Sequence, residues 1–290
     1  MEKLNLNAFA DEASPMIDGQ IKACLRNGLQ GLEIRGVDGV NVTAISDGTA
    51  RAVKKKLDDA GLKVWSIGSP IGKINIVTDS WEEHLEKLRR TIEIAHVLGT
   101  KYIRMFSFYY PEEDKPEKYR GEVLYRLNKM ADIAQAEDVV LCHENEKGIY
   151  GDIASRCFDI LTSVPRIRGV FDPANFVQCG QETLSAWEML KDHIFYMHIK
   201  DAFSDMRVVP AGKGEGHVPE IVRDYLARGG REFTVEPHLK VFGSLRGLEQ
   251  EGAKSMIGGV YQYRTNDEAF DAACGALREI LAGCGYGEDR

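Results

Sequence analysis

Four polar residues in the second half of the chain each close a short apolar run, and they are separated by roughly one strand-plus-helix unit. They are Glu144, Asp172, His198 and Glu236. If the apolar runs are parallel strands, these side chains lie at strand carboxyl ends, where an α/β barrel places its chemistry. Three carboxylates and one imidazole suit a divalent cation such as manganese, magnesium or zinc. The pattern therefore predicts a metal site.

The segments that must position these residues alternate between short β-branched or aromatic runs and longer stretches of helical periodicity. Eight strands are predicted, at Leu4–Ala8, Gly31–Ile34, Lys63–Ile67, Tyr102–Phe106, Val139–His143, Arg168–Phe171, Ile194–His198 and Phe233–Val235. Helices are predicted at Pro15–Asn27, Gly48–Ala60, Ser80–Leu98, Lys115–Glu137, Asp152–Ser163, Thr183–Lys191, Pro219–Arg228 and Glu268–Ala282.

Eight strand–helix units with no linker between them favour one closed (β/α)8 barrel, a TIM barrel, as a single domain over residues 1–290. An open doubly wound sheet is the alternative. It normally carries a glycine-rich phosphate turn after its first strand, and Asn7–Glu12 (NAFADE) is not one.

A long connection, Leu239–Tyr263, separates the eighth strand from the last helix and exceeds the usual length of a βα loop. Its apolar residues, such as Phe242 and Ile257, favour a segment that lies over the carboxyl face and controls substrate entry or docks a partner chain. The alternative is that this segment pads the outside of the barrel.

Composition narrows the function classes. The net charge of −8 argues against a nucleic-acid groove, and the 43% hydrophobic content is enough for a continuous core. The six cysteines form no C-x-x-C pair, which is typical of reduced thiols in a reducing compartment. The N-terminus lacks a signal-peptide profile, and no apolar run reaches the ~20 residues that span a bilayer. We expect a soluble cytoplasmic protein with no membrane partner.

Five motifs stand at or near the ends of the predicted strands: GLEIR at 31–35, HENE at 143–146, FDPAN at 171–175, HIKD at 198–201 and VEPH at 235–238. With these motifs the chain resembles the xylose isomerase-like TIM barrels, the sugar phosphate isomerase/epimerase superfamily, over essentially its whole length. The resemblance implies that Glu144, Asp172, His198 and Glu236 hold one divalent metal, often Mn²⁺, with Mg²⁺, Co²⁺ or Zn²⁺ as alternatives. It also implies that Glu144 and Glu236 carry the proton during catalysis.

Two positions depart from the family pattern. Many relatives have a histidine where this chain has Glu146, and relatives that isomerise or epimerise sugars often have another where this chain has Asn175. Both positions contact substrate in relatives, so these departures leave the metal ligands intact and put the reaction and the substrate in doubt.

Further substrate-binding candidates follow from side-chain alternation along a strand, which puts residues i and i+2 on one face. Glu146, Lys200 and His238 therefore border the same cavity as Glu144, His198 and Glu236. Arg104 and Glu33, near the ends of their strands, are weaker candidates for binding hydroxyls or a carboxylate.

Other residues have plainer interpretations. His143 faces away from its neighbour Glu144 in a regular strand and is expected to make a structural hydrogen bond. His84 falls in a predicted helix and is expected at the surface. Trp65 is either a core residue or a stacking platform for a sugar ring.

Two enzyme functions fit these residues. The first is a metal-dependent isomerase or epimerase of a small-molecule sugar, which acts through proton abstraction next to a carbonyl and a stabilised enediolate. The second is a lyase with the same enolate chemistry, either an inosose-type dehydratase or a 3-keto-glycoside or C-glycoside deglycosidase. The chain is expected to form a homo-oligomer, or a hetero-oligomer with a small β-rich subunit if it is a lyase. An abasic-site endonuclease lacks its histidines and basic face here, and a non-catalytic sugar-binding barrel is disfavoured by the four ligands.

Overall fold

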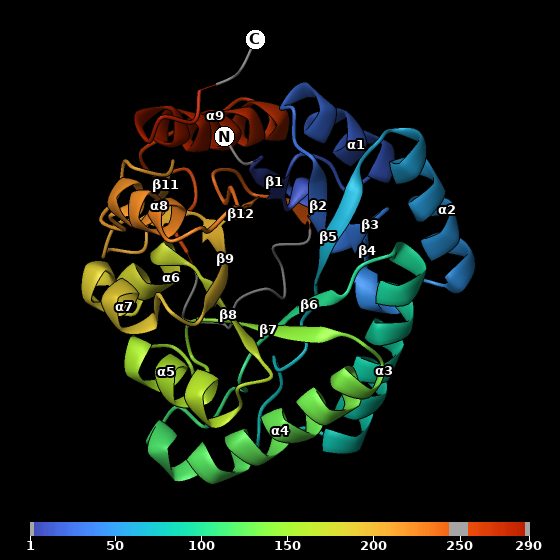
Figure 1. The fold of residues 1–290 in the computed structure, drawn as a ribbon, viewed down its shortest axis with the longest axis vertical. Helices are drawn as coiled ribbons and strands as arrows, with labels where there is room; N and C mark the ends of the chain where they lie inside the picture. The colour runs from blue at the N-terminus through green and yellow to red at the C-terminus, as the bar shows by residue number, and fades with distance from the viewer. Residues whose placement is uncertain (1–2, 244–254, 288–290) are drawn as a thin grey trace.

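The computed structural model describes residues 3–243 and 255–287, and at its centre eight parallel strands form a closed barrel. Around the barrel the order is β1-β12-β9-β8-β7-β6-β5-β2, so the first and last barrel strands of the chain are neighbours (Figure 1). The barrel strands are β1 Asn5–Ala8, β2 Gly31–Ile34, β5 Lys63–Gly68, β6 Tyr102–Met105, β7 Val140–Glu144, β8 Arg168–Phe171, β9 Ile194–Ile199 and β12 Glu232–Val235. The predicted barrel and its strands are confirmed, each end within one residue.

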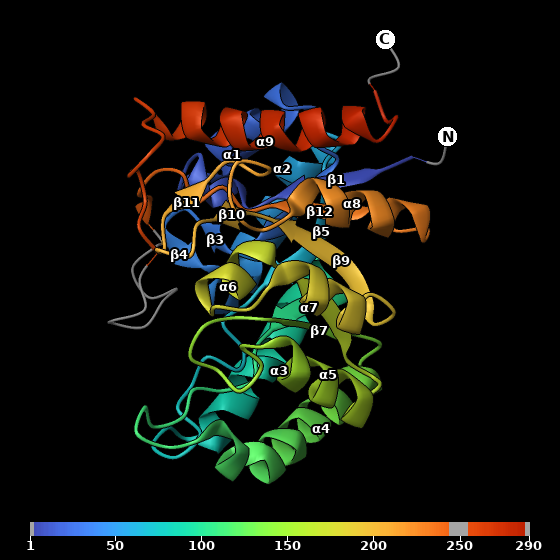
Figure 2. The same ribbon diagram turned by 90° about the vertical axis from the view of Figure 1, so that its left-hand side faces the viewer.

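Helices surround the barrel on all sides (Figures 1 and 2). They are α1 Ile17–Arg26, α2 Asp47–Asp59, α3 Trp81–Leu98, α4 Arg120–Ala136, α5 Ala154–Ser163, α6 Pro173–Gln178, α7 Thr183–Leu190, α8 Val218–Ala227 and α9 Asn266–Gly283. In the described part of the chain, no helix is long and apolar enough to cross a membrane.

The sequence prediction missed the short elements of the loops. These are α6, the 3-10 turns η1 Ala10–Glu12, η2 Val42–Ala44 and η3 Pro116–Tyr119, and two hairpins of two-residue strands, β3 Gly36–Val37 with β4 Val40–Asn41 and β10 Asp201–Ala202 with β11 Val208–Val209. Elements this short hold too few residues to show a hydrophobic period.

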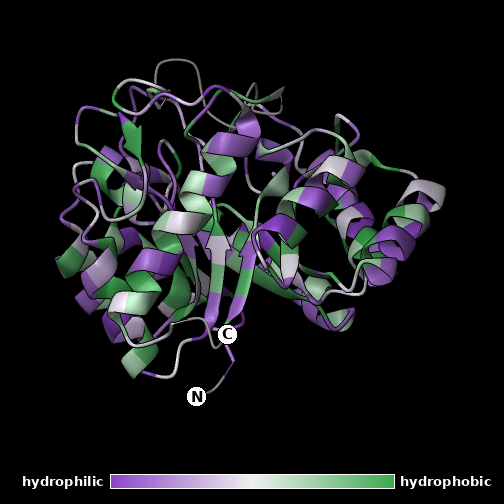
Figure 3. Ribbon diagram, turned by 90° about the horizontal axis from the view of Figure 1, so that it is seen from above, coloured by the Kyte–Doolittle hydropathy of each residue, from purple (hydrophilic) through white to green (hydrophobic). Residues whose placement is uncertain are grey.

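Helix α3 shows how local sequence fixes these boundaries. The Ser80 hydroxyl accepts a hydrogen bond from the Glu83 backbone N–H, which caps the first turn. Gly99 ends the helix in the left-handed conformation at φ 75°. Between them Leu88 and Ile92 are buried on the face that packs toward the core. Hydrophilic and hydrophobic residues alternate along the surrounding helices, as expected for helices that pack one face against the core and expose the other (Figure 3).

His84, on the same helix, is buried, so the prediction that it lies at the surface is wrong. Its Nε2 accepts a hydrogen bond from the Gly72 backbone N–H at 2.8 Å. Burial lowers the pKa of His84 to about 4. The helical period alone did not reveal that this position faces the loop after β5.

The connection after β12 is described at its two ends. Leu239 and Phe242 are buried, whereas Val241 is exposed. Met256 pairs with Arg207 beside β11, and its backbone N–H donates to Met206 O at 2.8 Å. The predicted lid over Leu239–Tyr263 also includes residues 244–254, which lie outside the described part of the chain, so the lid stays a prediction.

Candidate metal centre

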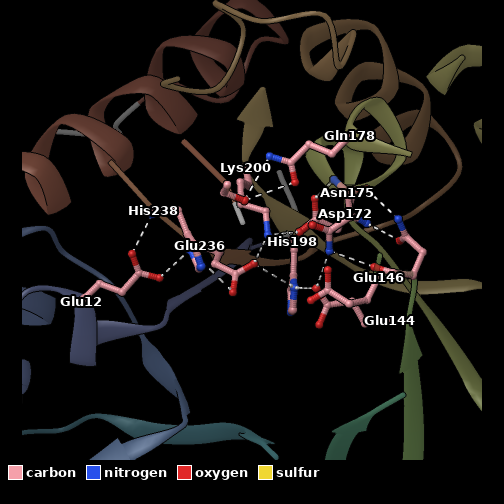
Figure 4. A network of polar contacts seen from close by, with 12 residues as sticks. Glu12, Glu144, Glu146, Asp172, Asn175, Gln178, His198, Lys200, Glu236 and His238 are labelled. Carbon is pink, nitrogen blue, oxygen red and sulfur yellow. Dashed lines mark hydrogen bonds and ion pairs between the residues drawn. The ribbon is translucent and has the colours of Figure 1, made fainter. Parts of the chain in front are cut away.

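The four predicted ligands converge at the carboxyl end of the barrel. Glu144 is the last residue of β7, Asp172 follows β8 directly, His198 lies in β9, and Glu236 follows β12 directly. These four strands are consecutive neighbours in the barrel. One ligand atom from each residue lies within 4.8 Å of the other three, and all four residues are buried (Figure 4).

The imidazole of His198 is held from behind. Its Nε2 is 3.1 Å from Glu33 Oε2, and the other Glu33 oxygen accepts a hydrogen bond from the Tyr196 hydroxyl at 2.8 Å. The opposite nitrogen, Nδ1, faces the centre at 3.1 Å from Glu144 Oε1. A carboxylate behind a histidine is the usual support of a metal-binding imidazole. Glu33 is fully buried, and its contact with His198 Nε2 fits this supporting role.

Two ligand atoms lack hydrogen bonds. Among the described residues, His198 Nδ1 and Asp172 Oδ2 are buried nitrogen and oxygen atoms without a hydrogen-bond partner. The other Asp172 oxygen is used, because Oδ1 accepts the Asn175 N–H at 3.0 Å and caps α6. Buried polar atoms are rarely left unsatisfied. Two such atoms in a set of one nitrogen and three carboxylates fit a divalent ion of the manganese, magnesium or zinc type.

Lys200 contacts two of the four candidate ligands. Its Nζ is 2.8 Å from Asp172 Oδ2, at ion-pair distance, and donates a hydrogen bond to Glu236 Oε2 at 2.7 Å. Burial disfavours the ammonium form, but the two carboxylates hold the pKa of Lys200 well above its usual range. Lys200 and a bound metal ion would therefore compete for the same carboxylate oxygens of Asp172 and Glu236.

The electrostatics keep most of the centre ionised. Burial works against a charged imidazole, but Glu144 and Glu33 raise the pKa of His198 to about 10. Burial would raise the pKa of Glu236, yet Lys200 and neighbouring cations hold it well below its usual range. Asp172 is the exception, because burial raises its pKa to about 6 against the effect of Lys200.

The predicted substrate-binding residues gather around this centre. Arg104, Glu146, Lys200 and His238 line a crevice together with Glu144 and Glu236. Asn175 lies behind Glu144, and its Nδ2 donates to Glu144 Oε1 at 3.2 Å and to Asn145 O at 2.9 Å. The structure thus brings all five predicted residues together, with Asn175 on the protein side of a ligand.

Sequence reasoning missed the cationic wall of the crevice. Arg35 is buried and donates to both oxygens of Asp11 at 3.0 Å, to Glu12 Oε1 at 3.1 Å and to Glu236 Oε1 at 3.2 Å. Lys73, in the loop after β5, donates to Glu146 Oε2 at 3.0 Å. The signal for Arg35 was present, because a charged residue directly after β2 matches a charged pair, Asp11 and Glu12, that begins three residues after the end of β1.

His238 occupies a strained position beside Glu236. Its backbone is left-handed, with φ 45°, which is uncommon for a residue with a side chain. Its N–H donates to Glu12 Oε2 at 2.6 Å, and its Nδ1 is 3.0 Å from Glu12 Oε1. The ring lies edge-on to Phe242 at 5.3 Å. Glu12 therefore holds the imidazole over the crevice (Figure 4).

Two interpretations outside the crevice are now decided. His143 makes a structural contact as predicted, because its Nε2 lies 2.9 Å from Ser107 Oγ in the interior. Burial lowers the pKa of His143 to about 4. Trp65 packs against Tyr102 at 4.9 Å and Phe195 at 5.8 Å in the amino half of the barrel. It is half-buried and packs against the buried cluster that contains Tyr196, which favours a packing role over a stacking platform for a sugar.

Comparison with known proteins agrees with this geometry. A family model described as xylose isomerase-like TIM barrel matches residues 21–239. Curated proteins give no significant sequence match.

Three solved structures of similar fold share 15–18% identity with this chain. The probable 3-DHS dehydratase AsbF from Bacillus anthracis superposes with a TM-score of 0.72 at 15% identity, covering 95% of this chain and 98% of its own. D-allulose 3-epimerase from Methylomonas sp., in complex with D-allulose, gives 0.69 at 18% identity and covers 97% and 98%. The IOLI protein with a bound zinc atom gives 0.72 at 16% identity and covers 97% and 99%. At this identity the likeness shows the fold.

Proposed function

Because the chain belongs to the xylose isomerase-like TIM barrel family, we propose that it is a divalent-metal-dependent enzyme that isomerises or epimerises a small sugar. The observation that carries the proposal is the convergence of Glu144, Asp172, His198 and Glu236 with two ligand atoms that lack hydrogen bonds. Manganese as the ion, a single domain over 1–290, a homo-oligomer and a cytoplasmic location belong to the same proposal.

The strand order supports roles for two glutamates. Strands β8 and β9 lie between β7 and β12 in the barrel, so Glu144 and Glu236 approach the centre from opposite sides. When bound, a divalent ion supplies Lewis acidity that polarises a carbonyl and stabilises the charge left by proton removal. One carboxylate removes the proton from the carbon beside the carbonyl and keeps it, and the other, protonated beforehand, delivers a proton of its own to the opposite face of that carbon.

Neighbouring side chains hold these groups in place. Glu33 fixes the ring of His198, and Arg35 positions Glu236 through a hydrogen bond of 3.2 Å. Lys200 and His238 lie at the crevice where hydroxyls of the substrate would enter. The side chains are buried, which strengthens each of these interactions because bulk water does not screen them.

A lyase that uses the same proton abstraction is the second candidate, and Asn175 favours it. Its amide donates to Glu144 Oε1 at 3.2 Å but cannot act as an acid or a base near neutral pH. Glu144 therefore lacks the titratable neighbour that many sugar isomerases of this family carry. Proton removal on one face followed by loss of water or an aglycone needs no second proton carrier at that position, and in this case we propose a small β-rich partner subunit.

Deuterium exchange separates the two candidates. Manganese-loaded protein is incubated in deuterated water with keto sugars, inososes and 3-keto-glycosides. Deuterium in a recovered or epimeric sugar identifies an isomerase or epimerase, and release of water or an aglycone identifies a lyase. The matched control is Asp172→Asn, which changes a ligand and leaves both glutamates in place. Absence of exchange and of elimination across the panel would overturn the proposal.

A further inference from the structure

The pairing between strands β7 and β8 stops short of one of their two candidate ligands. The strands pair in parallel from Cys142 opposite Arg168 to Glu144 opposite Val170. Asp172 lies two residues beyond that last pair, between the end of β8 and the start of α6. A ligand at such a position needs contacts other than strand pairing to stay at a fixed distance from Glu144.

The side chain of Asn145 makes this connection. Its Oδ1 accepts a hydrogen bond from the Asp172 backbone N–H at 2.9 Å, and its Nδ2 donates to the Asp172 backbone carbonyl at 2.9 Å. An amide side chain has both a donor and an acceptor, so it satisfies both backbone groups of one residue as a neighbouring strand would. An aspartate at this position would lack the donor. Asn145 is 1% exposed, so the two hydrogen bonds lie in the interior.

Asn175, in the first turn of α6, makes a second connection in the opposite direction. Its Nδ2 donates to Asn145 O at 2.9 Å and to Glu144 Oε1 at 3.2 Å (Figure 4). Its backbone N–H donates to Asp172 Oδ1 at 3.0 Å. Its own Oδ1 accepts no hydrogen bond within the described ranges, so the two acceptors that face Nδ2 fix the orientation of this amide.

Together Asn145 and Asn175 form a closed set of contacts, which we call the amide clamp. Asn145 holds the backbone of Asp172, and Asn175 holds one side-chain oxygen of Asp172 and one of Glu144. On Asp172 the clamp uses Oδ1 and leaves Oδ2, the oxygen that Lys200 contacts, for a cation. The clamp therefore links the two ligands without using the oxygen that faces the centre.

We propose that Asn145 and Asn175 act together as positioning residues, which fix the separation of Glu144 and Asp172 and so set the affinity of the metal centre. This inference rests on the proposed function, since it concerns how the ligands of the proposed ion are held. Ligands that are already in place bind an ion more tightly, because less ordering is required at the moment of binding. Neither amide acts as an acid or a base near neutral pH, so the contribution of both is geometric.

Metal titration tests the inference without requiring turnover. Asn145→Ala and Asn175→Ala should each weaken Mn²⁺ binding about tenfold or more, measured by electron paramagnetic resonance. Asn175→His should lie between Asn175→Ala and the parent, because a neutral imidazole donates one hydrogen bond where the amide donates two.

Asn128→Ala is the matched control. The Asn128 amide in α4 also makes two hydrogen bonds, since it donates to Leu124 O at 2.9 Å and accepts from Arg166 at 2.9 Å. Its loss should leave Mn²⁺ affinity within twofold of the parent. A purely structural role of the clamp would lower the free energy of unfolding of the metal-free protein and leave the affinity unchanged, as in this control.

The double variant distinguishes a clamp from two separate contacts. Because the loss of either amide already releases the connection, Asn145→Ala with Asn175→Ala should bind Mn²⁺ within threefold of the weaker single variant. Independent contacts would instead multiply their effects. That product in the double variant, or parent-like affinity in a folded single variant, overturns the inference.

Hydrogen exchange provides a second measurement. Since the Asp172 amide donates to Asn145 Oδ1, Asn145→Ala should raise exchange in a peptide covering 171–175 about tenfold, and Asn128→Ala should leave it unchanged. Unchanged exchange in Asn145→Ala contradicts the inference. If Asn145→Ala does not fold, Asn175→Ala and Asn175→His carry the test, because both leave the backbone groups of Asp172 satisfied.

The two proposals fail separately. If the clamp variants weaken Mn²⁺ binding but the parent catalyses neither exchange nor elimination, the clamp stands and the proposed function is wrong. If the parent is active with manganese and the folded clamp variants bind the ion as tightly as the parent, the proposed function stands and the clamp is wrong.

Discussion

The two ends of the barrel interior are built from the same strands but differ in chemistry. The carboxyl end holds acidic and basic side chains, among them Glu33, His198 and Glu236, at 5% exposure or less. The amino end holds a stacked aromatic group in which Trp65 lies 4.9 Å from Tyr102, with Phe195 and Tyr196 also in contact. The barrel thus places its chemistry in one layer and its packing in the layer beneath.

Strand β9 shows how closely the two layers lie. Tyr196 packs at 5.9 Å from Trp65, while its hydroxyl reaches Glu33 at 2.8 Å. His198, two residues further along the strand, takes the other oxygen of Glu33. A step of two residues along β9, from Tyr196 to His198, therefore leads from a packing role to a ligand role. This arrangement predicts that variants in the upper layer change activity or metal affinity and variants in the lower layer change stability.

The largest expected effect comes from the upper layer. Glu236→Gln should lower turnover at least 100-fold, about 2.7 kcal/mol in barrier, and weaken metal binding less, because an amide keeps a ligand oxygen and cannot carry the proton. Steady-state kinetics and metal titration measure the two effects. Glu232→Gln, at the amino end of the same strand, is the control and should stay within twofold. If turnover of Glu236→Gln stays within tenfold of the parent, a group other than Glu236 carries the proton.

The boundary between the layers should give an intermediate effect. Glu33→Gln should weaken metal binding about 10–100-fold, because it disturbs the carboxylate behind His198. Tyr196→Phe removes only the hydrogen bond to the Glu33 oxygen that does not contact His198, and it should weaken metal binding less. Manganese titration followed by electron paramagnetic resonance reports both. Equal affinities in the parent and Glu33→Gln would show that the imidazole is oriented without Glu33.

The lower layer should respond in stability alone. Trp65→Leu should lower the free energy of unfolding by about 2–3 kcal/mol, because it removes contacts with three aromatic rings. Urea unfolding measures this change. Turnover should remain within twofold at a temperature where the variant is folded. A large loss of turnover in the folded variant would mean that the two layers are coupled.

The smallest effect concerns a histidine outside both layers. The pKa of His84 is about 4 in the folded protein and near 6.5 when unfolded, so the unfolded state binds the extra proton first. The stability that neutral His84 contributes is present above pH 6.5 and is lost as the pH falls toward 4. Between pH 7.5 and 5.5 the loss should be about 1 kcal/mol, measured as the difference in unfolding between the parent and His84→Gln. If the free energy of unfolding of the parent and of His84→Gln depends on pH in the same way, the prediction is wrong.

Much of this organisation was readable from the sequence because it depends on local patterns. The barrel strands appear in the sequence as short apolar runs, and several of them end at a polar residue that lies at the carboxyl end of the barrel. Glu144 and Asp172 could therefore be assigned to the site from the order of the strands along the chain. Arg35 and Glu12 could not be given partners, because the contact of Arg35 with Glu236 and that of Glu12 with His238 depend on closure between the first and last strands. Lys73 was also missed, since it comes from a loop without a period.

Closure has a consequence for how the protein matures during synthesis. Strand β1 is completed only when β12 pairs with it, from Asn5 opposite Glu232 to Ala8 opposite Val235. Until the ribosome has released β12, the edge of β1 that β12 will cover stays unpaired, and such edges recruit other strands. Glu236 leaves the ribosome with that last strand, so a nascent chain lacks one ligand until the barrel can close. Capture of the proposed metal ion would therefore be a late event, and we expect chains truncated before Glu232 to emerge without the ion and prone to aggregation.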